Sequence, residues 1–296
     1  MSEEEVKHKK PTHKVVSNIV SGVLWGLILL LIVFQVLMVR SSTYTEFGVP
    51  SLFGTSFMIA IIGVTNDDVL YFKTKMTLEE QGNLFGDILY YKGTLSKQAV
   101  VVVAAGESCY LSAMATSMII ARFEPYLIFN IGSVSAISPQ LKQGDIFIPD
   151  RYYFDQVDFT ANLLGEYGQI PGHGAFIVAD GDLNSTVEST SYLLTNRYVQ
   201  RGYVLSSNTF YMDETALTAD IKAHFLKVDN LIAYDTSSAG VALACQMSKT
   251  SLLTIKAVSY QIGRDEQKLN YVRKGLEVMP VIGKIITRFL IEKESE

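Results

Sequence analysis

Two turns in the sequence place chemically useful side chains soon after short apolar runs. One is the glycine–serine pair Gly132-Ser133, which follows the apolar and aromatic run 125–129. The other is the acidic pair Asp67-Asp68, which follows another apolar run. Such runs are typical of buried strands, and open α/β sheets bind ligands beyond the carboxyl ends of their strands. The glycine–serine turn therefore predicts a ligand site, and a carboxylate in such a site could act as a general base.

Two further segments accompany this turn. They are 141–146, Leu-Lys-Gln-Gly-Asp-Ile, and 166–172, Glu-Tyr-Gly-Gln-Ile-Pro-Gly. Together with the Gly-Ser pair and its spacing, they resemble the methylthioadenosine/S-adenosylhomocysteine nucleosidases of the purine nucleoside phosphorylase superfamily. The resemblance extends from about Met58 to Leu290. It implies one α/β domain in which a central mixed sheet is flanked by helices.

The chemistry of that family sets out which groups to look for. Hydrolysis of the N-glycosidic bond of a purine nucleoside needs an acid for the leaving purine, a base for water and a group that holds the ribose hydroxyls. The resemblance places Asp68 at the position of the water-activating glutamate. Aspartate is one methylene shorter, and an error of about 1 Å can cost about 100-fold in rate. The alternative is that Asp67 and Asp68 only stabilise a helix N-terminus.

The other two carboxylates of the family are replaced. Its sugar-binding Glu-Met-Glu run corresponds to Asp-Thr-Ser at 235–237, which places Ser237 at the second glutamate. Alternatively, Ser237 and Ser238 cap the helix that follows. The family's Arg-Ala-Ile-Ser-Asp run corresponds to Lys-Ala-Val-Ser-Tyr at 256–260, which places Tyr260 at the proton donor. A phenol with a pKa of about 10 is poorly matched to proton delivery at neutral pH.

The resemblance also assigns ligand contacts. Phe210 corresponds to the aromatic residue that stacks on the purine, Ser133 lies by the ribose, and Tyr271 resembles an aromatic lid near the 5′ carbon. The full set is Ser133, Phe210, Tyr211, Thr236, Ser259 and Tyr271. With 15 Phe and 16 Tyr in the chain, these aromatic residues could instead belong only to the core. The family's Gly-Ile-Gly-Lys loop is here Ala-Gly-Glu-Ser, which places the acid Glu107 in a turn that faces the ligand.

Three altered carboxylates predict a nucleosidase homologue that binds a purine nucleoside or serves as a scaffold without efficient hydrolysis. One alternative is an active nucleosidase for methylthioadenosine- or S-adenosylhomocysteine-like nucleosides, which uses Asp68 with Tyr260 or Asp265. Another is a structural partner for a second membrane protein. No cofactor or metal is implied. In the family the loop that corresponds to 169–172 crosses a two-fold interface, so a homodimer through Gln169–Pro171 is expected.

The N-terminus predicts a membrane anchor. No charged residue occurs from Val15 to Val39, a run long enough to cross a bilayer and longer than the apolar part of a signal peptide. Four lysines precede this run and only Arg40 follows it before Lys73, so a cytoplasmic N-terminus and an extracytoplasmic domain are expected. The anchor, with residues 48–54, resembles that of some type I signal peptidases, but the peptidase serine is absent. The predicted parts are a cytoplasmic basic tail at 1–14, a transmembrane helix at 15–39, a linker at 40–56 and the nucleosidase-like domain at 57–296.

The remaining composition excludes several classes. The net charge is −5 and charged residues make up 19%, so nothing indicates nucleic-acid binding. Cys109 and Cys245 are the only cysteines, and their distance in sequence indicates neither a metal site nor a particular disulfide. After the linker, strands and helices alternate in a doubly wound manner. Strands are expected at 57–63, 88–95, 99–105, 127–130, 145–148, 203–205, 231–234 and 252–258, and helices at 112–123, 185–201, 239–247 and 267–291.

Overall fold

The structure, a computed structural model, describes residues 57–211, 214–264 and 270–294. These residues all fall in one compact unit, Ser56–Glu296. The predicted basic tail, transmembrane helix and linker lie outside the described residues. Among the helices within the described ranges, none combines the length and the apolar character needed to cross a membrane.

Strands and helices alternate over part of the described chain, but two runs of three strands each have no α-helix between them. The strands are β1 (Met58–Gly63), β2 (Thr77–Phe85), β3 (Ile88–Leu95), β4 (Gln98–Ala104), β5 (Leu127–Ala136), β6 (Ile146–Phe154), β7 (Ile177–Val178), β8 (Val199–Ser206), β9 (Leu231–Asp235) and β10 (Ser251–Gln261). The helices are α2 (Leu70–Lys75), α3 (Cys109–Phe123), α4 (Gly181–Leu194), α5 (Glu214–His224), α6 (Ser238–Ser248) and α8 (Tyr271–Glu294), with a short 3-10 helix at Thr160–Asn162.

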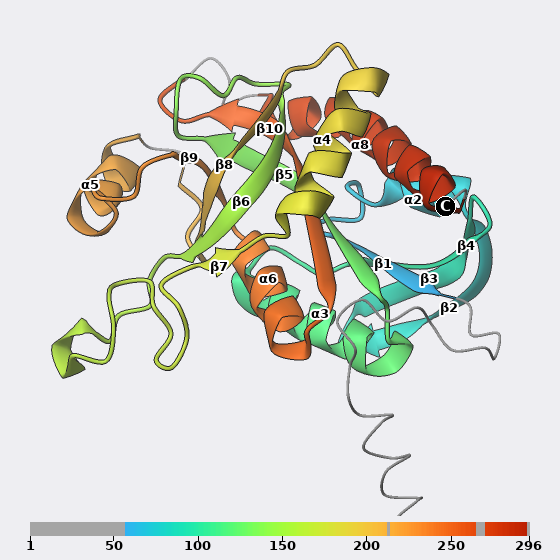
Figure 1. Cartoon of the computed structure of the whole chain (residues 1–296), viewed down its shortest axis with the longest axis horizontal. Coiled ribbons are helices and arrows are strands. Elements are labelled where there is room, and N and C mark those ends of the chain that lie inside the picture. Colours follow the sequence, from blue (N-terminus) through green and yellow to red (C-terminus); the bar gives the residue numbers. More distant parts are fainter. Residues whose placement is uncertain (1–56, 212–213, 265–269, 295–296) are drawn as a thin grey trace, which may run out of the picture. The chain divides into compact units, whose positions relative to one another are not determined.

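The described strands form one mixed sheet, in the order β10-β6-β8-β9-β5-β1-β4-β3-β2, with β7 paired to β6 (Figure 1). β1 lies between β4 and β5 and runs parallel to both. β10 pairs in parallel with β5 and antiparallel with β6. Strands β5, β10, β6, β8 and β9 therefore form a closed circuit. The predicted α/β class with a central mixed sheet is confirmed. The closed circuit of strands was not predicted, because the sequence indicated only a doubly wound sheet.

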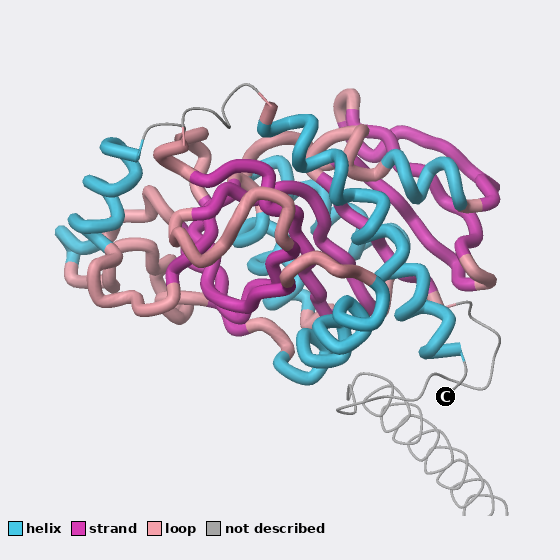
Figure 2. Tube along the Cα trace, turned by 90° about the horizontal axis from the view of Figure 1, so that it is seen from above, coloured by secondary structure: helices cyan, strands magenta, loops and turns pink. Residues whose placement is uncertain are grey.

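Alternate side chains of β1 supply both sides of the core. Ile59 and Ile61 belong to the cluster that includes the apolar face of α8, whereas Ala60 and Ile62 belong to the cluster that includes α3 and α6. This is the two-residue alternation of a strand that is buried on both faces. Figure 1 shows α3 and α6 on one side of the sheet and α4 and α8 on the other. In Figures 1 and 2, α5 lies at one end of the domain, apart from the helices that cover the sheet.

The expectation of a glycine–serine turn is wrong. β5 does not end at Asn130 but continues through Gly132 and Ser133 to Ala136, and it pairs with β10 over this length. Gly132 has a φ of +131°, a conformation that only glycine adopts without strain. Glycine is therefore needed here to keep the strand paired, and Ser133 is presented from a strand instead of a loop.

The helix predicted at 185–201 is also misplaced. It begins at Gly181, because the Asp180 carboxylate accepts hydrogen bonds at 3.0 Å from the N–H groups of Asp182 and Leu183. It ends at Leu194, and Arg201 belongs to β8. The sequence expectations also omit α2, β2, β7 and α5. β2 is largely exposed on both faces, so it lacks the apolar alternation by which a strand is recognised.

Candidate active site

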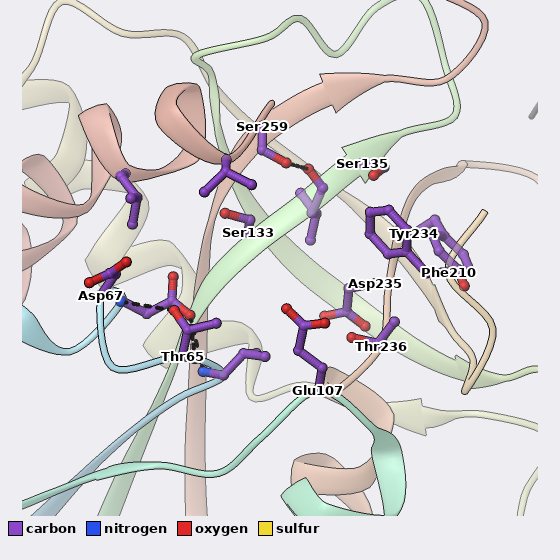
Figure 3. Close-up of a pocket in the computed structure, with 15 residues that line it drawn as sticks. Thr65, Asp67, Glu107, Ser133, Ser135, Phe210, Tyr234, Asp235, Thr236 and Ser259 are labelled. Atoms are coloured by element: carbon purple, nitrogen blue, oxygen red, sulfur yellow. Dashed lines mark hydrogen bonds between the residues drawn. The ribbon is translucent and has the colours of Figure 1, made fainter. Parts of the chain in front are cut away.

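A pocket opens where several strands of the sheet end (Figure 3). Its lining residues are Val64, Thr65, Asp67 and Asp68 after β1, Glu107 after β4, Ser133, Val134 and Ser135 on β5, Phe210 after β8, Tyr234, Asp235 and Thr236 at the end of β9, Ser259 on β10, and Val272 and Leu276 on α8. Five residues predicted for the site thus meet in one place: Asp68, Ser133, Phe210, Thr236 and Ser259.

Asp68 is held in a fixed orientation at the edge of this pocket. Its Oδ2 accepts hydrogen bonds from the N–H groups of Thr65 at 2.8 Å and Val64 at 3.2 Å. Its Oδ1 has no hydrogen-bond partner among the described residues, although the residue is only 5% exposed. The N-cap position of α2 is Val69, and no side chain caps it. The interpretation of Asp68 as a helix cap is therefore wrong.

A buried amine lies behind the pocket. Lys256 is fully buried, and its Nζ donates to Asn130 Oδ1 at 3.1 Å, to the Ile131 carbonyl at 3.0 Å and to Ser237 Oγ at 3.2 Å. The same atom lies 3.6 Å from Asp235 Oδ2. Burial lowers the pKa of Lys256, and the negative charges of Asp235 and Asp68 act in the opposite direction. Lys256 is thus a built-in countercharge for the acidic side chains in front of it.

Asp235 caps the helix that follows β9. Its Oδ1 accepts hydrogen bonds from Ser206 Oγ at 2.6 Å and from the N–H groups of Ser237 and Ser238 at 3.2 Å. Its Oδ2 accepts from the hydroxyl of Ser238. The expected cap by Ser237 itself is absent, because this side chain occupies the N-cap position of α6 without a capping hydrogen bond. Asp235 takes over that role and lines the pocket at the same time.

Two of the three predicted catalytic residues do not line the pocket. Ser237 is 2% exposed and its hydroxyl accepts from Lys256. Tyr260 is fully buried in a cluster with Tyr153, Leu205 and Phe225. The pairing of β10 with β5 shifts register between Val258 and Tyr260, so that Tyr260, and not Ser259, is the partner of Ser135.

Aromatic residues close one side of the pocket. Phe210 is 48% exposed, and it lines the pocket together with Tyr234. The Tyr234 hydroxyl is buried and has no hydrogen-bond partner among the described residues; the Ser207 hydroxyl affects its pKa but lies outside hydrogen-bond geometry. Burial strongly raises the pKa of Tyr234, so its hydroxyl remains a donor. Tyr211 packs edge-on against Tyr234 at 5.4 Å between centroids and does not line the pocket.

Tyr271, Asp265 and the two cysteines are not among the described residues that line the pocket. Tyr271 is the first residue of α8, and its side chain lies outside the described structure, as does Asp265. Cys109 and Cys245 are buried free thiols, and burial raises the pKa of each to about 12, so neither is a nucleophile at neutral pH. Within the described ranges, no group of three His, Cys, Asp or Glu residues could hold a metal ion.

Comparison with known proteins identifies the family, because residues 58–290 match the family model of the phosphorylase superfamily. The chain belongs to the phosphorylase superfamily. A 5′-methylthioadenosine/S-adenosylhomocysteine nucleosidase of Anoxybacillus flavithermus is 28% identical over 207 residues, which are 70% of this chain and 87% of the relative. A relative from Bacillus thuringiensis has the same name, identity and coverage.

Solved structures of the superfamily agree with this fold. The Neisseria meningitidis nucleosidase, in complex with methylthio-immucillin-A, has a TM-score of 0.70 at 24% identity over 78% of this chain and 99% of that chain. The Colwellia psychrerythraea nucleosidase, in complex with adenine, has a TM-score of 0.69 at 25% identity over 79% of this chain and 98% of that chain. The predicted resemblance to the nucleosidases is confirmed.

This phosphorylase-superfamily pocket contains three acids that were not among the predicted site residues, namely Asp67, Glu107 and Asp235. Asp235 is the last residue of the buried strand β9, and an acid at the end of an apolar run was the available signal. Glu107 was recognised as an acid in a ligand-facing turn, and the structure places it in the lining. Figure 3 shows its side chain pointing toward Asp235 and Thr236.

Proposed function

We propose that the domain hydrolyses the N-glycosidic bond of purine nucleosides, with Asp68 as the base that activates water. The observation that carries this proposal is the geometry of Asp68. Two backbone N–H groups fix one of its oxygens, and the other has no hydrogen-bond partner among the described residues. A general base needs this combination of a fixed position and a free acceptor. The curated relatives, named as nucleosidases, support the same reaction.

In the proposed reaction, water adds to the anomeric carbon while the bond from that carbon to the purine nitrogen breaks. Asp68 takes the proton of the attacking water and later releases it to solvent. The electron pair of the broken bond goes to the purine, which takes up a proton from solvent. Tyr234, whose buried hydroxyl has no partner among the described residues, donates a hydrogen bond to the leaving purine. The carboxylates of the pocket stabilise the positive charge that develops on the sugar.

A binding protein without efficient turnover is the second candidate. The observation in its favour is that neither Tyr260 nor Ser237 lines the pocket, so neither of them stands in for the family's acid or its second sugar-binding carboxylate. General acid catalysis is worth typically about 100- to 10,000-fold. Loss of general acid catalysis lowers the rate of an enzyme that keeps Asp68 in place, but it does not abolish the reaction.

The test is base release by the purified full-length chain. Methylthioadenosine, S-adenosylhomocysteine, adenosine and inosine are incubated with it, with and without phosphate, and the free base is measured by chromatography. The proposal predicts release that does not depend on phosphate, because water is the nucleophile. Binding of the same nucleosides without release would favour the second candidate. The absence of both binding and release would contradict both candidates.

We propose that the chain forms a homodimer through the Gln169–Pro171 loop, as the resemblance implies. An exposed apolar stripe on α3 supports a dimer, since Tyr110, Met114 and Met118 are 71%, 50% and 38% exposed at a spacing of four residues. Met114→Lys would then give a monomer in light scattering. We also propose that residues 15–39 anchor the domain outside the cytoplasm. Protection of the domain from protease added to intact cells would contradict that location.

A further inference from the structure

Two carboxyl groups outside the pocket are not used by the proposed reaction. Asp155 follows β6 and is 3% exposed, and Asp220 lies on α5 with a side chain that is 18% exposed. The Oδ2 atom of each is buried, and neither has a hydrogen-bond donor among the described residues. A buried acceptor without a donor costs free energy. The two oxygens therefore need a hydrogen that no described neighbour supplies.

A single proton between the two groups supplies that hydrogen. Two ionised carboxylates cannot bond to each other, whereas a protonated one donates to its neighbour. Burial, the negative charge of Asp155 and a hydrogen bond to Asp155 raise the pKa of Asp220 to about 6. Asp155 Oδ1 already accepts from the Gln156 N–H at 2.8 Å and from the Tyr167 hydroxyl at 3.2 Å. Asp220 Oδ1 lies 3.9 Å from His224 Nε2, so the two Oδ2 atoms are the ones that share the proton.

The pair joins the long loop after β6 to α5. Asp155 begins this loop, and the ring of Tyr167, further along it, stacks on the ring of His224 of α5 at 3.6 Å between centroids. When the shared proton is lost, two negative charges face each other where little water screens them, and their repulsion favours separation of the loop from the helix. The contact between loop and helix is therefore stable only while the pair holds its proton.

The same loop is tied to the aromatic side of the pocket. Gln156 donates from Nε2 to Thr209 Oγ1 at 2.6 Å, and Thr209 precedes Phe210, which lines the pocket. The Asp155 N–H donates to the Ser206 carbonyl at 2.9 Å. Gln156 has a φ of +60°, a strained conformation for a residue with a side chain, so its position depends on these contacts. A change at the carboxyl pair thus reaches a side chain that faces the ligand.

We propose that Asp155 and Asp220 share one proton that holds the loop after β6 against α5, and that nucleoside binding in the pocket is thereby linked to proton uptake. Both are positioning residues, because they act on the ligand through Gln156, Thr209 and Phe210. This inference rests on the proposed function, since it takes the pocket to bind nucleosides. The affinity should be highest at acid pH, where the pair is protonated, and should fall as the pH rises through about 6.

Other titratable groups face the pair from the elements packed against it. They are Tyr167 in the loop, Tyr211 after β8, Tyr234 on β9, Cys109 on α3 and His224 on α5. Burial raises the pKa of each tyrosine and of the thiol, so these four groups stay uncharged below pH 8. Histidine is a residue type that titrates between pH 5 and 8, so His224 needs a variant of its own.

The experiment uses the full-length chain with Asp68→Asn, in which turnover is slow and the proposed base does not titrate. Its affinity for methylthioadenosine, which is uncharged between pH 5 and 8, is measured by calorimetry across this range. A pKa of about 6 in the closed state, against 3.8 in the open state, predicts binding about 5- to 10-fold tighter at pH 5 than at pH 8. At pH 6, buffers of different ionisation enthalpy should show that binding takes up about half a proton.

Adding Asp220→Asn to this chain replaces the shared proton with an amide, which donates to Asp155 at every pH. The affinity should then change by less than about twofold between pH 5 and 8. Asp229→Asn, which alters an exposed carboxylate, is the matched control, and it and His224→Gln should both keep the full pH dependence. Equal affinity at pH 5 and 8, a pH dependence that survives in Asp220→Asn, or one that disappears in His224→Gln would each overturn the proposal.

The two proposals fail in different ways. If the affinity depends on pH through Asp220 but the unsubstituted chain releases no base, the hydrolytic function is wrong and the proton linkage stands. If the unsubstituted chain releases base and the affinity does not change with pH, the hydrolysis stands and the proton linkage is wrong. The absence of binding at every pH would contradict both.

Discussion

Asp68 and Lys256 converge on one point beside Gly132. A Cβ built on this glycine would lie 3.5 Å from Asp68 Oδ2 and 3.5 Å from Lys256 Nζ. The two charged atoms are therefore no more than 3.5 plus 3.5, or 7.0 Å, apart. The proposed base and the buried countercharge thus share a single backbone position, at which β5 adopts a glycine conformation in order to stay paired with β10.

The first prediction concerns this glycine. Gly132→Ala forces a φ of +131° on a residue with a side chain, so the free energy of unfolding should fall by about 1–3 kcal/mol. Turnover should fall as well, because the strand that carries Ser133 shifts against Asp68. Urea unfolding and base release measure the two effects. Gly181→Ala is the control, since nothing lies within 4 Å of a Cβ there; an equal loss in both variants would contradict the account.

The second prediction concerns the buried pair of Lys256 and Asp235. Lys256→Met leaves Asp235 buried without its countercharge, so the free energy of unfolding should fall by about 3–5 kcal/mol. Adding Asp235→Asn to this variant should recover part of the loss, because the uncompensated charge is then removed. Urea unfolding of the two single variants and the double variant gives the coupling. Simple additivity of the two losses would show that the ammonium and the carboxylate do not stabilise each other.

The third prediction uses the hydroxyl of Tyr234. Tyr234→Phe removes a buried group without a hydrogen-bond partner among the described residues, so the free energy of unfolding should stay the same or rise by about 1 kcal/mol. Base release should nevertheless fall by about 10-fold, because the leaving purine loses a donor. In the control Tyr152→Phe, a hydrogen bond of 2.9 Å to Thr254 is lost, so stability should fall while base release stays unchanged. Unchanged turnover in Tyr234→Phe would remove Tyr234 from the mechanism.

The fourth prediction concerns pH. Burial, and then the negative charge of Asp155, raise the pKa of Asp220 from 3.8 to about 6. The folded state therefore holds this proton more tightly than the unfolded state does, and the associated stability is complete below about pH 4 and lost as the pH rises through about 6. His224 also faces Asp220. Its Nε2 lies 3.9 Å from Asp220 Oδ1, and its ring stacks on that of Tyr167.

Asp220→Asn removes the proton that titrates. Its free energy of unfolding should vary less than that of the unsubstituted chain between pH 4 and 6, and at pH 7 the variant should be more stable by on the order of 1 kcal/mol, a value reduced because the pair is partly solvated. Urea unfolding at several pH values measures this pH dependence. Asp229→Asn, which alters an exposed carboxylate, is the control. A variant that keeps the full pH dependence would assign the effect to other groups.

Much of the fold was predictable from the sequence, because buried strands such as 59–62 and 100–103 are continuous apolar runs. β2 was not, since it lacks an apolar face. Asp68 could be placed because it follows a recognisable strand at a recognisable spacing. Tyr260 could not, because it is buried in the core against residues distant in the sequence, such as Tyr153 and Phe225. The cap formed by Asp235 could have been predicted, because it is a local contact with the N–H groups two and three residues later and aspartate is a preferred capping residue at the start of a helix.

The central claim is that Asp68 is the base of a hydrolytic reaction, and one comparison tests it most directly. Base release from methylthioadenosine is measured for the unsubstituted chain, for Asp68→Asn and for Asp68→Glu, with nucleoside affinity measured in parallel. The account predicts that Asp68→Asn loses at least about 100-fold in turnover with little change in affinity, while Asp68→Glu, which keeps a carboxylate, retains activity. Equal turnover in the unsubstituted chain and Asp68→Asn would contradict it.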